Sequence, residues 1–124
     1  MKVKFFKTEE FKWPCCGEVI MCPQLLEMLE EAREHAGFPF RITSGYRCEK
    51  HNKEVKGVED SAHTKGLAVD IAVSDSRQRY WLLIALLSAG FRRIGIAENY
   101  IHVDIDNSKP RFVVWTYYKK SKNK

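Results

Sequence analysis

Two short segments with alternating apolar and polar residues, 67–73 and 100–106, constrain the fold of this chain more than any other feature. Successive side chains of a β-strand point to opposite faces of a sheet, so this alternation predicts strands with one buried face. The large apolar side chains that we expect in the core are Val69, Ile71, Val73, Ile101, Val103 and Ile105. The opposite faces then carry Asp70 on one strand, and His102 and Asp104 on the other.

The rest of the chain predicts two helices and further strands. Pro23 suits the first turn of a helix over 23–35 that has a stripe of leucines on one side. Asp75 and Gln78 are spaced as a capping box for a second helix that runs to Ala89. Because its apolar residues lie nearly all round, we expect this second helix to be buried at the centre. Helical turns are expected over 8–11 and 49–56, and strands over 40–44, 91–96 and 111–117.

This order of elements predicts an α+β fold with a central, mostly antiparallel sheet and helices packed on one face. The 124 residues fit one domain, which we place at 1–118, followed by a basic tail over 119–124 that we expect to be disordered. A hydrophobic content of 44% is that of a globular protein rather than a disordered one. The chain has no run of eighteen apolar residues, so we expect no membrane span, and we expect a monomer.

The formal net charge of +5 raises the question of polyanionic partners. Part of this charge lies in the tail over 119–124, where the basic residues form no pattern, so we expect no nucleic-acid binding. An acidic bacterial cell wall remains one candidate polyanion. The N-terminus lacks the apolar stretch and cleavage site of a signal peptide, which predicts synthesis in the cytoplasm and export, if any, by another route.

The chain has four cysteines, namely Cys15, Cys16, Cys22 and Cys48. In a reducing cytoplasm, thiols or metal ligands are expected more than disulfides. The spacing fits no standard Cys-x-x-Cys knuckle. Free thiols, a second and structural metal, and a disulfide therefore all remain open at this point.

Two imidazoles and a carboxylate form a candidate metal site, with His63, Asp70 and His102 as the ligands. If strands 67–73 and 100–106 are neighbours, Asp70 and His102 lie across one sheet face with Cβ atoms about 5 Å apart. His63 lies in a glycine-containing loop that can fold back over that face. Two histidine nitrogens and one aspartate oxygen are a ligand set suited to zinc, with the fourth position left for water. Because such an open position is typical of a catalytic site, the pattern predicts a small metallohydrolase.

Five sequence elements, in order, resemble the M15 family of zinc peptidases. They are Ser44-Gly45-Tyr46-Arg47, His51-Asn52, Ser61-x-His63-x-x-Gly66-x-Ala68-x-Asp70, His102-x-Asp104 and Trp115. The family includes D-alanyl-D-alanine carboxypeptidases and dipeptidases, and the L-alanyl-D-glutamate endopeptidases of phage endolysins. Residues 11–17 look like the compact phage and prophage branch. The resemblance implies the fold that these enzymes share with the zinc-bearing signalling domain of hedgehog proteins.

The resemblance also implies roles for individual residues. It implies that His63, Asp70 and His102 bind Zn²⁺. Arg47 matches the family arginine that holds the substrate carbonyl or carboxylate, where a permanently charged guanidinium can stabilise an oxyanion. Tyr46 lies beside it in the same substrate-binding segment. Ser61 matches a serine that approaches the substrate, although a simple turn residue fits that position as well.

The general base is where the chain departs from the family pattern. Many relatives have a glutamate three residues before the last histidine, and here that position is Asn99, which cannot take a proton. Two carboxylates nearby are candidates for this role, Glu98 and Asp104. Asp104 shares a strand face with His102, so it could instead orient the His102 ring. If neither carboxylate works as a base, the domain binds zinc without hydrolysing a substrate.

The resemblance therefore predicts a zinc-dependent peptidase that cleaves peptidoglycan stem peptides. Both a D-Ala-D-Ala carboxypeptidase and an L-Ala-D-Glu endopeptidase fit, because the loops that close the cleft decide between them. The missing signal peptide fits a phage or prophage lysin that reaches the wall after release. The alternative is a non-catalytic, zinc-containing cell-wall-binding or phage-structural module of the same fold.

Overall fold

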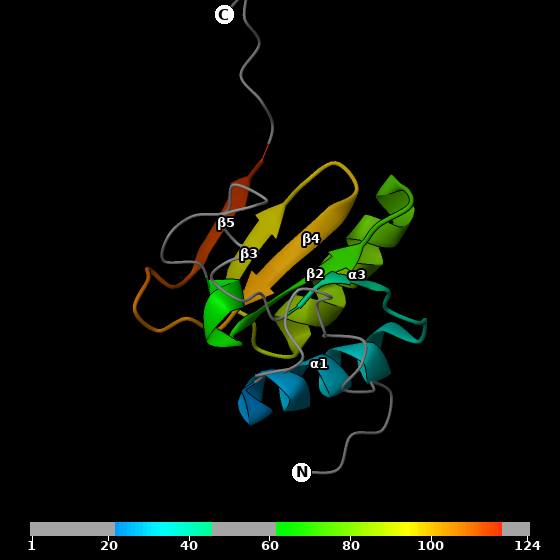
Figure 1. Cartoon of the computed structure of the whole chain (residues 1–124). Coiled ribbons are helices and arrows are strands. Elements are labelled where there is room, and N and C mark those ends of the chain that lie inside the picture. Colours follow the sequence, from blue (N-terminus) through cyan, green and yellow to red (C-terminus); the bar gives the residue numbers. More distant parts are fainter. Residues whose placement is uncertain (1–21, 46–61, 118–124) are drawn as a thin grey trace, which may run out of the picture.

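A computed structural model of the chain describes residues 22–45 and 62–117 (Figure 1). Its elements are α1 (Pro23–Ala36), β1 (Ile42–Ser44), the 3-10 helix η2 (Ala62–Lys65), β2 (Ala68–Ala72), α3 (Ser76–Ser88), β3 (Arg93–Ile96), β4 (Tyr100–Asp104) and β5 (Val113–Thr116). Both predicted helices and all five predicted strands are present, and the α+β class is confirmed. The turns expected over 8–11 and 49–56, and the tail over 119–124, lie outside the described residues.

The strands form one five-stranded sheet in the order β1-β2-β4-β3-β5 (Figure 1). Three of the pairings, β1 with β2, β2 with β4 and β4 with β3, are antiparallel, as expected. The edge strand β5 is parallel to β3. The segment after β4 therefore passes the end of β3 before the chain enters β5, and the sheet is mixed rather than purely antiparallel.

The core lies between the sheet and the two helices, which cover the same face of the sheet (Figure 1). The strands contribute the apolar faces predicted from the alternation, and the helices contribute one stripe each. The fully buried members are Leu25, Leu29, Ala32, Val69, Leu82, Leu86, Ile94, Ile101 and Val103. Because the large apolar side chains point toward the helices, the polar side chains of β2 and β4 share the opposite face of the sheet.

The expectation that α3 is buried on all sides was wrong. Leu82, Ala85 and Leu86 are buried, but Trp81 and Leu87 expose about half of their surface, at 52% and 51%. A helix in a two-layer fold turns only one side toward the sheet and its neighbouring helix. Apolar residues beyond that side remain at the surface, so a helix with apolar residues on every side need not be enclosed by protein on every side.

The start of α3 follows the predicted capping pattern with one change. The Asp75 side chain accepts a hydrogen bond from the main-chain N–H of Gln78 at 2.7 Å. The Gln78 side chain accepts from the N–H of Ser74 at 2.6 Å, one residue earlier than in a standard capping box. The first bond satisfies an N–H group that the first turn of a helix leaves without a partner, and the second ties that turn to the residue before the cap.

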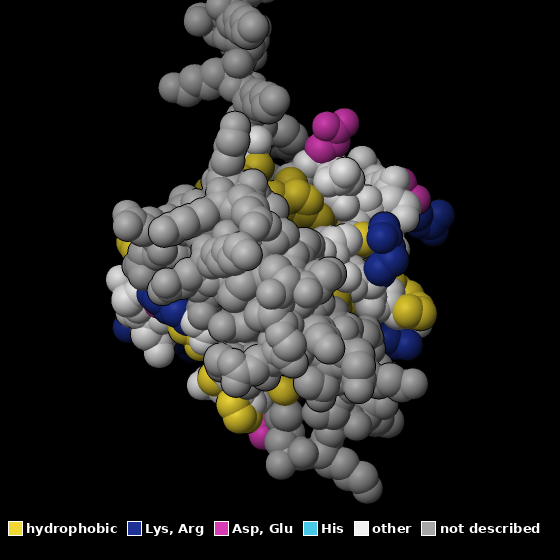
Figure 2. Space-filling view, viewed as in Figure 1, with side chains coloured by type: hydrophobic (Ala, Val, Ile, Leu, Met, Phe, Trp, Pro, Cys, Tyr) yellow, Lys and Arg dark blue, Asp and Glu magenta, His cyan; other side chains and the backbone are white. Residues whose placement is uncertain are grey.

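The surface carries charges of both signs. On the face shown in Figure 2, Lys and Arg side chains of the described residues lie toward the left and right margins, and acidic side chains lie near the top and bottom. Within residues 22–45 and 62–117, no helix is both long enough and apolar enough to span a membrane.

Candidate metal centre

The sheet register places two of the predicted ligands side by side. Asp70 of β2 is paired directly with His102 of β4, which confirms that these strands are neighbours. The same row continues to Gly95 of β3 and to Trp115 of β5. Asp70 and His102 therefore face the side of the sheet that is opposite to α1 and α3.

The third predicted ligand, His63, comes from η2 and not from a strand. Gly66 follows η2 with φ +71°, a left-handed conformation that glycine adopts without strain and that turns the chain into β2. The carbonyl of Gly66 accepts a hydrogen bond from the N–H of Cys22 at the start of α1. His63 Nδ1 donates to the carbonyl oxygen of Gly45 at 2.8 Å, which leaves Nε2 toward Asp70.

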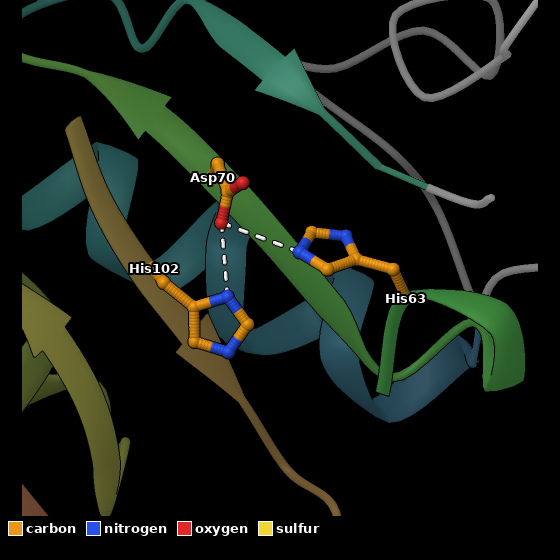
Figure 3. A group of neighbouring side chains, drawn as sticks. All are labelled: His63, Asp70 and His102. Atoms are coloured by element: carbon orange, nitrogen blue, oxygen red, sulfur yellow. Dashed lines mark hydrogen bonds and ion pairs between the residues drawn. The ribbon is translucent and has the colours of Figure 1, made fainter. Parts of the chain in front are cut away.

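The three side chains converge on one oxygen atom (Figure 3). His63 Nε2 lies 3.3 Å from Asp70 Oδ1, and His102 Nδ1 lies 2.9 Å from the same oxygen. One possible ligand atom of each residue lies within 4.8 Å of the others, and all three residues are buried. Among the described residues, this is the one group of His, Cys, Asp and Glu side chains arranged in this way.

The donor set fits a divalent cation of the zinc type. Zinc-to-ligand bonds of 2.0–2.2 Å in a tetrahedron imply ligand atoms roughly 3.3 Å apart, close to the observed separations around Asp70. Both ring nitrogens that face away from the centre have partners, His63 Nδ1 at the Gly45 carbonyl and His102 Nε2 at Asp104 Oδ2, 2.7 Å away. Metal-binding histidines nearly always have such a partner, which fixes the tautomer and the ring orientation.

The charges and hydrogen bonds around His63, Asp70 and His102 favour a positive charge between these side chains. Burial alone would raise the pKa of the Asp70 carboxyl, but the hydrogen bonds from His102 and His63 outweigh it and lower that pKa below its usual range. Burial alone would lower the pKa of His102, but the hydrogen bonds to Asp104 and Asp70 outweigh it and raise that pKa. These contacts therefore favour the protonated form of the His102 imidazole, which lies between two carboxylates.

The two candidate general bases lie in different environments. Asp104 is only 2% exposed, and both of its oxygens are occupied. Its Oδ2 faces His102, while Oδ1 accepts from Arg93 Nε at 2.7 Å and from the N–H of Asp106 at 3.1 Å. Glu98 lies exposed in the turn between β3 and β4, where its main-chain carbonyl accepts a hydrogen bond from the guanidinium of Arg79.

Several predicted residues lie outside the described ranges. They are Tyr46, Arg47 and Ser61 of the predicted substrate site, and Cys15, Cys16 and Cys48. Cys22, the remaining cysteine, is a free thiol of intermediate exposure at the start of α1. Its side chain packs against the hydrophobic core, which fits the free-thiol interpretation for this one residue.

Three contacts of the site were not anticipated from the sequence. They are the Gly45 carbonyl on His63, the Arg93 guanidinium on Asp104, and an ion pair between Lys65 Nζ and Asp106 Oδ2 at 3.0 Å. The ion pair connects η2 to the segment after β4, and so ties the elements that carry His63 and His102. Gly45 stands in one of the family-like motifs, but no motif indicates its contact with His63, and Arg93 and Asp106 belong to none of the five motifs. Only the tertiary structure brings these residues to the site.

We expect Asp106→Asn to lower the free energy of unfolding by about 1–2 kcal/mol at pH 7, because charge-assisted hydrogen bonds are lost. Burial alone would raise the pKa of Asp106, but hydrogen bonds from Ser108 and Lys65 lower it below the value of the unfolded chain. This stabilisation is therefore present above the unfolded pKa of 3.8 and is lost as the pH falls through the folded value.

Urea unfolding at pH 7 and at pH 2.5 measures this difference. The difference in the free energy of unfolding between the wild type and Asp106→Asn should be smaller at pH 2.5 than at pH 7. Asp75→Asn is a matched control, because asparagine caps a helix about as well as aspartate does. An equal gap at both pH values would contradict the electrostatic interpretation.

The fold and the site together define an α+β domain with a His–Asp–His group that could hold a metal ion. The sequence profile of the Peptidase M15 family matches residues 5–106. The chain therefore belongs to the M15 peptidase family, and its fold is of the hedgehog/DD-peptidase type. M15 peptidases are zinc-dependent hydrolases, so the family places this chain among the metallopeptidases. A comparison with curated proteins found no match.

Proposed function

We propose that this protein is a zinc-dependent peptidase that hydrolyses peptide bonds in peptidoglycan stem peptides. The observation that carries the proposal is the convergence of His63 Nε2, Asp70 Oδ1 and His102 Nδ1 on one side of the sheet. A zinc ion held by His63, Asp70 and His102 would supply Lewis-acid chemistry for the scissile carbonyl and would lower the pKa of water toward neutral pH. The contacts of both histidine rings support this ligand set, because each ring is held from its far side.

Three residues are proposed to hold the substrate next to this centre. Arg47 follows Gly45 by two positions, at most about 7 Å along the chain, and the Gly45 carbonyl contacts His63. The Arg47 guanidinium is proposed to bind the substrate carbonyl or carboxylate, because the guanidinium remains charged at any working pH. Tyr46 in the same segment and Ser61, which directly precedes η2, are proposed to contact the peptide.

The two carboxylates are proposed to have different roles. Asp104 is proposed to hold the His102 ring. Both of its carboxylate oxygens already contact groups inside the protein, so neither is left to take a proton from water. Glu98 is then the proposed general base, since its side chain is exposed in the turn that leads into β4. The hydrogen bond from Arg79 to the Glu98 carbonyl holds the main chain of this turn, so that only the side chain has to move.

A second candidate function is a non-catalytic wall-binding or phage-structural module that keeps the fold and the metal. Asn99 favours it, because this residue stands where many relatives have the catalytic glutamate. The two functions differ in a single observable, which is whether the protein cleaves the wall or only binds to it.

Hydrolysis of two defined peptides tests the proposal, one ending in D-Ala-D-Ala and one with an internal L-Ala-D-Glu bond. We expect cleavage of one of them, with complete loss after treatment with a chelator and recovery when zinc is added back. The peptide that is cleaved assigns carboxypeptidase or endopeptidase activity. Binding to purified peptidoglycan without release of either product would refute the peptidase and support the module.

A further inference from the structure

A glycine occupies β3 where the sheet passes the metal centre. Gly95 pairs with His102 on one side and with Trp115 on the other. A Cβ atom built on Gly95 would lie 2.6 Å from Trp115 Nε1 and 2.6 Å from Tyr117 Cε2, whereas real Cβ contacts are essentially never below 3.0 Å. Gly95 lies in a regular strand and is not among the glycines with positive φ, so space and not backbone conformation requires glycine here.

The space above Gly95 is filled by aromatic rings that reach His102. The centroids of the Trp115 and His102 rings are 5.6 Å apart, and those of Tyr117 and His102 are 6.5 Å apart. Trp115 and Tyr117 also contact each other, with centroids 6.2 Å apart. Aromatic rings attract one another at such separations. Side chains from β5 and its end thus cross β3 and contact a residue of β4, although β5 and β4 are not neighbouring strands.

A second route joins Trp115 to His102 through charged groups. The guanidinium carbon of Arg93 lies 4.9 Å from the centre of the Trp115 ring, in cation–π contact. Arg93 Nε donates to Asp104 Oδ1 at 2.7 Å, and Asp104 Oδ2 lies 2.7 Å from His102 Nε2. His102, Asp104, Arg93 and Trp115 therefore form a closed circuit around Gly95, and each member restrains the next.

We propose that Gly95 is a positioning residue for the metal centre, because it lets Trp115 lie across β3 and hold the His102 ring with Nδ1 toward Asp70. The inference rests on the metal-binding part of the proposed function. A ligand ring that is already oriented loses little rotational freedom when it binds a metal. Loss of the outer partners of a metal-binding histidine typically weakens metal affinity by about 10–100-fold.

Zinc dissociation constants, measured by competition with a chromophoric chelator, test this inference. We expect Gly95→Ala and Trp115→Ala each to weaken zinc binding by about ten-fold or more. The double variant should lose less than the two single losses combined, because Gly95 acts through the ring that is then absent. Trp115→Phe keeps an aromatic ring over Gly95 and should retain most of the affinity.

Val114→Ala is a matched control, since Val114 precedes Trp115 on β5 and is 61% exposed. It should leave zinc affinity unchanged. The visible spectrum of the cobalt-loaded protein gives a readout that lower stability alone does not move, and Trp115→Ala should shift its bands while Val114→Ala does not. If Gly95→Ala fails to fold, the Trp115 variants decide the question.

Wild-type affinity and an unshifted cobalt spectrum in Trp115→Ala would overturn the inference and leave the proposed function intact. A wild-type protein that binds no zinc would overturn the proposed function and this inference with it. The two failures are therefore distinguishable in one set of measurements.

Discussion

Replacement of Asp70 by alanine is expected to abolish zinc binding and to lower the proposed peptidase kcat/KM by about a thousand-fold or more, equivalent to ~4 kcal/mol of transition-state stabilisation. The reason is geometric, because His63 and His102 both approach Asp70 Oδ1. Without it, two buried imidazoles remain and the negative charge that offsets the metal is lost. Zinc content per chain and kcat/KM are the measurements.

Two further variants sharpen this result. Asp70→Asn keeps the shape of the side chain but removes its charge, so zinc binding should weaken and not vanish. Asp75→Asn is the matched control, since Asp75 caps α3 and belongs to none of the contacts of the centre. A full equivalent of zinc in Asp70→Ala would contradict the assignment of this carboxylate as a ligand.

The second large effect separates the two carboxylates near His102. At saturating zinc, Glu98→Gln should lower kcat by about 10²–10⁴-fold with little change in zinc affinity, as expected for loss of a general base. Asp104→Asn should weaken zinc binding by about 10–100-fold and recover much of its kcat when zinc is in excess. The structural reason is that Asp104 is buried between His102 and Arg93, whereas Glu98 is exposed in a turn.

Glu34→Gln is a control for the glutamate variant, because Glu34 lies exposed on α1, which packs on the other face of the sheet. Asn99→Glu in the Glu98→Gln background returns a glutamate to the position used by many relatives, and kcat should rise again. A loss of kcat in Asp104→Asn that saturating zinc does not restore would reverse the two roles.

Much of the fold could be predicted because the side-chain period of a strand is two. The alternation over 67–73 and 100–106 assigned each residue to the core face or to the opposite face, and the buried residues confirm it. The burial of α3 could not be predicted in the same way. Its apolar residues lie nearly all round, and the sequence does not state which side meets a neighbour.

One partner of a candidate ligand, Asp104 beside His102, could be anticipated from the shared strand face, but the other supporting contacts of the site could not. Gly45, Arg93 and Lys65 reach the site by hydrogen bonds or ion pairs with residues more than ten positions away. Such contacts leave no periodicity, since they depend on strand order and on the parallel addition of β5.

The candidate ligands, the faces of β2 and β4, and the peptidase family could all be read from the amino-acid sequence. The alternation of side chains along a strand depends only on neighbouring residues, and the chemistry of a motif depends on its side chains and not on the rest of the fold. Three features required the folded structure: Asp70 pairs directly with His102, Asp104 is enclosed by His102 and Arg93, and Trp115 lies across the backbone of Gly95. These facts depend on register and strand order, which are set by the packing of the whole domain.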